Sequence, residues 1–124
     1  MTDTAHQFCK IFVQATDIQS VAEKLALLLE AKLQRRTLFL PEAVVEVRGN
    51  PDLGLAEDFI GWPVTIEIEA GQEATNEAVA SLAARIVAAS WGDGTAAVAA
   101  CDYESELPWG GGIERLREHP GTAH

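Results

Sequence analysis

The chain has 124 residues, of which 48% are hydrophobic and 23% are charged, and its formal net charge at pH 7 is −10. This length and composition are those of one globular domain, and they exclude the polar, highly charged class of disordered chains. The excess of acids argues against binding to nucleic acid or to an anionic membrane, because both surfaces require clustered Lys and Arg side chains.

The first twenty residues lack the basic segment and the apolar run of a secretory signal. Two cysteines, Cys9 and Cys101, are too few for the disulfide framework of a small secreted domain. We therefore expect a cytoplasmic protein whose cysteines are reduced.

The first half of the chain predicts one strand and one helix. Residues 7–15, QFCKIFVQA, alternate between two faces with the period of a strand. Thr16 and Gln19 then have the spacing of a capping box, and apolar residues follow at helical spacing. We expect this helix to end within KLQRR, residues 32–36, where cations suit its C-terminus.

The second half predicts two strands, a helix and a final strand. Residues 43–51, AVVEVRGNP, and residues 63–71, PVTIEIEAG, both alternate apolar and charged side chains. A helix with an apolar stripe begins near Thr75 and ends at WGDG, residues 91–94. Residues 95–101, TAAVAAC, predict a short strand of small side chains.

This β-α-β-β-α-β order is similar to the ferredoxin-like arrangement, which predicts an α+β fold. Both helices would cover one face of a four-stranded antiparallel sheet in the order 4-1-3-2. The domain would span residues 1–110, and residues 111–124 would form a flexible tail with a short helix at 113–118. The other face of the sheet is expected to be open and to show Phe8, Lys10, Phe12, Gln14, Glu46, Thr65, Glu67 and Glu69.

The acids are concentrated in two segments. Residues 42–77 contain nine of the nineteen acids and one base, Arg48, whereas residues 102–106 add three acids and no base. The first segment includes GNPDLGLAEDFIGW, residues 49–62, which is far longer than a usual hairpin loop. Its acids and aromatic side chains suit an anchor with a charged rim, or the aromatics fold back to cap the core.

The second segment, CDYESELPWGGG at residues 101–112, has the same two interpretations. Its Leu-Pro-Trp sequence either fixes the C-terminus to the domain or stands exposed as an anchor. The segment should follow the last strand toward the start of the first strand. We expect the strand over residues 63–71 to run parallel to the first strand, which places the loop over residues 49–62 at the same pole. We therefore expect the two acidic segments to converge.

No motif specifies an enzyme or a cofactor. The three histidines, His6, His119 and His124, lie in the terminal segments, and the glycine run lacks the spacing of a phosphate-binding loop. Hard cations would need several carboxylates, but the spacing of a calcium loop is missing. A zinc set of His6, Cys9, Cys101 and Asp102 likewise lacks the usual ligand spacing. We expect no catalytic residue, metal or cofactor.

The sequence therefore predicts a small acidic module that binds a basic protein, as an immunity or inhibitor protein does, and that is a monomer or a homodimer. One alternative is a ligand-sensing domain that dimerises through its last strand. A second alternative is a carboxylate-dependent enzyme or a cation binder. The expected partner-binding residues are Asp52, Glu57, Asp58, Phe59, Trp62, Asp102, Tyr103, Glu104, Glu106 and Trp109.

Overall fold

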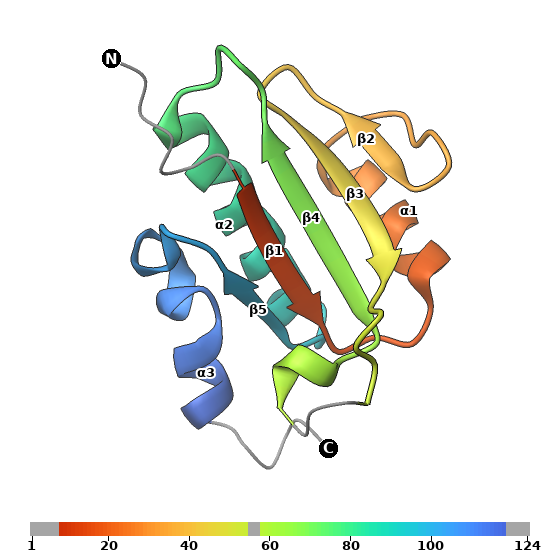
Figure 1. The fold of residues 1–124 in the computed structure, drawn as a ribbon, viewed down its shortest axis with the longest axis vertical. Coiled ribbons are helices and arrows are strands. Elements are labelled where there is room, and N and C mark those ends of the chain that lie inside the picture. Colours follow the sequence, from red (N-terminus) through yellow and green to blue (C-terminus); the bar gives the residue numbers. More distant parts are fainter. Residues whose placement is uncertain (1–7, 55–57, 119–124) are drawn as a thin grey trace.

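A computed structural model describes residues 8–54 and 58–118, and these form an α+β fold with a five-stranded antiparallel sheet (Figure 1). The order across the sheet is β2-β3-β4-β1-β5. The strands are β1 (Phe8–Val13), β2 (Thr37–Phe39), β3 (Ala43–Gly49), β4 (Val64–Ala70) and β5 (Ala97–Ala100). The helices are α1 (Ile18–Leu28), α2 (Asn76–Gly92) and α3 (Ile113–Glu118).

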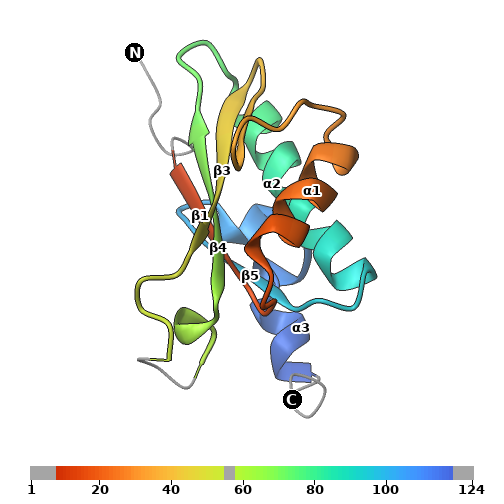
Figure 2. The ribbon, with the colours of Figure 1, turned by 90° about the vertical axis from the view of Figure 1, so that its right-hand side faces the viewer.

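The main core lies between the sheet and two helices. Figure 2 shows α1 and α2 on the same face of the sheet, with α3 beside β5. Alternate residues of the strands point into this layer, where they pack against the apolar stripe of α2. The largest fully buried side chains of the strands are those of Ile11, Val13, Leu38, Val45, Val47, Val64, Ile66 and Ile68.

The predicted ferredoxin-like fold with a four-stranded sheet is wrong, because the sheet has five strands, in the order β2-β3-β4-β1-β5. The additional strand, β2, pairs with β3 at one edge of the sheet. It occupies residues close to the expected end of the first helix. That helix stops at Leu28, and Glu30 follows with a left-handed φ of 52°, so the chain leaves the helical path early.

The cap of α1 also differs from the prediction. Asp17, rather than Thr16, is the N-cap residue, and its side chain accepts a hydrogen bond from the Ser20 N–H at 3.2 Å. The cap of α2 is Thr75, whose Oγ1 accepts from the Ala78 N–H at 3.0 Å. Both helices therefore begin at a side-chain oxygen that satisfies a free backbone amide.

The direction of β4 places the loop over residues 49–62 at the opposite end of the sheet from the acidic segment that follows β5. β4 runs antiparallel to β1, with Phe8 opposite Glu69 and Val13 opposite Val64. The loop that enters β4 therefore lies at the end of β1. β5 is also antiparallel to β1, with Lys10 opposite Ala100, so the segment after β5 lies at the start of β1. The prediction that the loop over residues 49–62 converges with the segment over residues 101–112 is wrong, because it assumed that β1 and β4 run in parallel.

The segment after β5 turns back along the outer edge of that strand. The Ala99 N–H donates to the Gly111 carbonyl at 2.7 Å, and the Trp91 Nε1–H donates to the Ala97 carbonyl at 2.9 Å. These bonds occupy the outer edge of β5, through which a second copy would pair in the predicted alternative of a dimer. Gly111 and Gly112 are buried there with φ of 86° and 101°, and α3 follows directly.

The face of the sheet opposite α1 and α2 is only partly open. Near the start of β4, Phe12 and Thr65 are buried, contrary to the prediction that both are exposed. Phe59 and Trp62 of the loop before β4 pack in one cluster with Phe12, and Ile113 and Leu116 of α3 pack against the same cluster. Toward the start of β1 the same face remains exposed, and Phe8 keeps 50% of its surface accessible.

Candidate functional site

The loop between β3 and β4 is organised by Asn50. Its Nδ2 donates to the carbonyls of Ile60 and Trp62, both at 2.7 Å, and its Oδ1 accepts from the Asp52 N–H at 2.9 Å. Asp58 caps the short 3₁₀ turn η1 (Phe59–Gly61) by accepting from the Ile60 N–H at 3.1 Å. Asp52 and Asp58 are both exposed. The backbone amide of Asp52 and the carboxylate of Asp58 also make hydrogen bonds that hold the loop together.

The aromatic residues of this loop face the protein. The Phe59 ring meets Phe12 edge-on at 5.4 Å and Trp62 edge-on at 6.3 Å, measured between ring centroids. Trp62 is only 9% exposed and packs in a cluster with Phe12 and Val98. Trp62 therefore has the geometry of a cap over this end of the sheet, and Phe59 is half-buried beside it.

The segment that follows β5 folds around a buried tyrosine. Tyr103 is 1% exposed and lies next to Cys9 and Cys101 in the core. The Glu104 carboxylate accepts from the Cys101 N–H at 2.9 Å, which fixes the bend after β5. Asp102 and Glu106 are exposed on the same segment.

Trp109 lies farther along this segment and packs against α2. Its ring meets Trp91 edge-on at 6.5 Å, and the Arg115 guanidinium lies 4.7 Å from the Trp109 ring and 5.0 Å from the Trp91 ring. Such cation–π contacts join α3 to α2. Trp109 is thus half-buried within the domain.

Six acids gather at the end of the sheet where β1 begins. The strand register brings the starts of β1 and β3 to the same end as the last residues of β4 and β5. We name this set the acidic end, and its members are Glu42, Glu69, Glu73, Asp102, Glu104 and Glu106. Lys10 lies close by, but its Nζ is 5.3 Å from the centre of the Phe12 ring, toward the opposite end of β1.

The expected partner-binding residues therefore form two groups. Asp52, Asp58, Phe59 and Trp62 lie at the end of β1, whereas Asp102, Tyr103, Glu104 and Glu106 lie at its start. Trp109 belongs to the second segment but packs beside α2. Glu57 lies outside the described residues.

A separate cleft of about 680 Å³ opens between α1 and α2. Its floor is the sheet, at Val13 and Ile66, and its walls come from the facing sides of the two helices. This volume is within the range of small-molecule sites. The lining is mainly apolar, with polar groups from Gln14, Thr16, Asp17, Ser20, Lys24, Ser90, Asp93 and Thr95.

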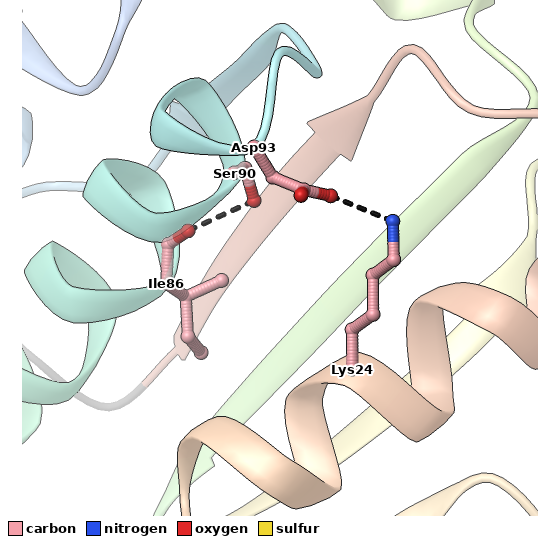
Figure 3. Close-up of polar contacts among 4 residues, drawn as sticks. All are labelled: Lys24, Ile86, Ser90 and Asp93. Atoms are coloured by element: carbon pink, nitrogen blue, oxygen red, sulfur yellow. Dashed lines mark hydrogen bonds and ion pairs between the residues drawn. The ribbon is translucent and has the colours of Figure 1, made fainter.

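An ion pair spans the mouth of this cleft (Figure 3). The Lys24 Nζ reaches from α1 to the Asp93 Oδ2 at 2.6 Å, and the two side chains are 61% and 53% exposed. The Ser90 hydroxyl points back into α2 and donates to the Ile86 carbonyl at 2.9 Å. Exposed pairs of this kind contribute less than about 1 kcal/mol to stability, so a ligand can replace one partner at little cost.

Within residues 8–54 and 58–118, no three His, Cys, Asp or Glu side chains are placed to hold a metal ion. The zinc set considered from the sequence includes His6, which lies outside these ranges. Over the same part of the chain, no helix is both long enough and apolar enough to cross a membrane.

Sequence reasoning missed the organising role of Asn50 and the pair of Lys24 with Asp93. The Gly-Asn-Pro sequence marks a turn, but it does not show that one amide side chain holds both ends of the following loop. Lys24 and Asp93 are 69 residues apart, and they meet only because α1 and α2 share one face of the sheet. A sequence pattern carries no signal for such a contact.

Comparison with known proteins gives no assignment, because the chain matches no protein-family model, no curated protein and no solved structure.

Proposed function

We propose that the protein is a binding module that captures a basic protein through the acidic end. The supporting observation is that six carboxylates and an exposed aromatic side chain, Phe8, share one end of the sheet. Immunity and inhibitor proteins that mask a cationic partner require a surface of this kind. This proposal moves the docking surface away from the loop between β3 and β4, whose aromatics pack inward.

Charge supports a basic partner. The net charge of −10 gives the whole molecule a negative electrostatic potential. The acidic end places several of the negative charges near the apolar side chain of Phe8. Complementary charge speeds the approach of a cationic partner and rejects acidic ones. Contact with Phe8, which is half exposed, would then remove apolar surface from water and slow dissociation.

Capture from the lysate of the source cell at low and high salt tests this function. The bait is compared with the double variant Glu69→Gln/Asp102→Asn, which removes two charges from the acidic end. The control, Glu23→Gln/Glu30→Gln, removes the same charge from exposed positions on and just after α1. We expect wild type and control to hold the same basic protein at low salt, and more weakly at high salt.

The acidic-end variant should lose most of that protein while its melting temperature stays unchanged. Equal capture by all three baits would contradict the proposal, and so would a captured protein that is itself acidic.

The cleft favours a second candidate function, the binding of a small apolar carboxylate. Its apolar floor and walls suit a hydrocarbon body, and Lys24 is positioned to accept a carboxylate in place of Asp93. We expect octanoate, used as a probe, to raise the melting temperature by binding the native state. Asp93→Asn should strengthen this effect because it frees Lys24, whereas Lys24→Met should abolish it. An unchanged melting temperature in both wild type and Asp93→Asn would remove this candidate.

A further inference from the structure

The two cysteines face each other across neighbouring strands. β1 and β5 are antiparallel, and Lys10 is opposite Ala100. Continuing this register by one residue brings Cys9 opposite Cys101. Both side chains turn to the helix-covered face, where Cys9 is fully buried and Cys101 is partly exposed.

The hydrogen-bond pattern defines the geometry of this pair. The Gln14 N–H donates to the Ala96 carbonyl, so Gln14 and Ala96 form a hydrogen-bonded pair. In an antiparallel ladder such pairs alternate with non-hydrogen-bonded ones, so Lys10 and Ala100 are also a hydrogen-bonded pair. The cysteines therefore occupy a non-hydrogen-bonded position, and the Cys101 N–H accordingly points outward to Glu104. The Cα atoms of such pairs are about 4.5 Å apart, which lies within the range that a disulfide spans.

The chemistry of the two thiols is unequal. A hydrogen bond with Cys9 lowers the pKa of Cys101, whereas that contact and burial raise the pKa of Cys9. Tyr103 lies beside both cysteines, and burial raises the pKa of its hydroxyl, so this group remains neutral. Cys101 is thus the more acidic and more accessible thiol, and Cys9 is held against it.

We propose that Cys9 and Cys101 are a thiol modification site that a peroxide converts reversibly into an intramolecular disulfide. The Cys101 thiolate attacks one oxygen of hydrogen peroxide, the O–O bond breaks, and the other oxygen takes up a proton and leaves as water. The Cys9 sulfur then attacks the resulting sulfenic acid. The S–O bond breaks, and its oxygen leaves with the Cys9 proton as a second water.

Two thiols are thereby oxidised and one peroxide is reduced to two waters. A thiol reductant reverses the change by thiol–disulfide exchange. The new bond would join the start of β1 to the segment that carries Asp102, Glu104 and Glu106. Oxidation would therefore fix this segment of the acidic end in place.

Intact mass spectrometry after peroxide treatment tests the site. The full-length reduced protein is treated with hydrogen peroxide, unfolded and alkylated with iodoacetamide. We expect the loss of two hydrogen atoms, no alkylation of either cysteine, and full recovery of both reactive thiols after dithiothreitol. The melting temperature of the oxidised protein should rise and return to its starting value on reduction.

Single variants separate this reaction from general oxidation. In Cys9→Ala the sulfenic acid at Cys101 has no thiol to attack it, so it should react with dimedone, and in Cys101→Ser peroxide should leave Cys9 unmodified. If Cys9→Ala does not fold, peptide mapping of the oxidised wild type identifies the bond directly. Two alkylated thiols after peroxide treatment, or a disulfide between two chains, would overturn the proposal.

Discussion

At the scale of residues, the glycines before α3 show how single backbone positions fix the end of the domain. Trp109, Gly110, Gly111 and Gly112 all have positive φ, so four consecutive residues occupy a region that favours glycine. A Cβ at Gly112 would lie 2.0 Å from the Ala97 carbonyl oxygen. The run is therefore needed for close contact with β5.

We expect Gly112→Ala to lower the free energy of unfolding by about 3 kcal/mol or more, because strained φ and a backbone clash act together. The matched control is Gly92→Ala at the end of α2, where an added Cβ meets nothing within 4 Å. That change should be neutral or stabilise the helix by up to about 1 kcal/mol. Urea denaturation of both variants measures the difference, and equal midpoints would contradict this role for Gly112.

At the residue level, the sequence predicted part of the pattern of buried strand residues. Alternation correctly placed Val45, Val47 and Ile66 inside the core, since burial on one face follows directly from the strand period. It failed for Thr65, which alternation places on the open face. Thr65 is buried opposite Phe12, at the end of the sheet where Trp62 and Phe59 of the preceding loop pack against Phe12.

At the scale of elements, the two edges of the sheet differ in how far other parts of the chain cover them. The outer edge of β5 bonds to Gly111 and Trp91, whereas β2 forms the other edge with the Phe39 side chain 59% exposed. Sequence reasoning missed β2 because three residues are too few to show a period. It also misjudged the direction of β4, since alternation defines the faces of a strand but not its direction relative to a neighbour.

Hydrogen exchange should distinguish the two edges. The Ala99 amide donates to Gly111 and should exchange slowly, at a rate governed by opening of the C-terminal segment. The register of β2 with β3 turns the Phe39 amide toward the outer edge, so it should exchange quickly. Residue-resolved exchange by NMR makes the comparison. Fast exchange at Ala99 would show that residues 109–112 do not cover β5 in solution.

At the scale of the whole molecule, the fold distributes charge that the sequence shows only as two runs. The sheet carries Glu69 to the same end as Asp102, although 33 residues separate them in the chain. It carries Asp52 and Asp58 to the other end, where the Asp52 backbone amide and the Asp58 carboxylate make hydrogen bonds within the loop. Composition predicted an acidic surface, but strand direction decides which acids share it.

Cross-linking with a carbodiimide tests the docking surface most directly, because this reagent joins a carboxylate to a lysine that touches it. The captured basic protein is mixed with the chain, cross-linked and mapped by mass spectrometry. We expect its lysines to be joined to Glu69, Asp102 or Glu106, and these links to disappear at high salt. Links confined to Asp52 and Asp58 would contradict the account, because they would place the partner at the opposite end of the sheet.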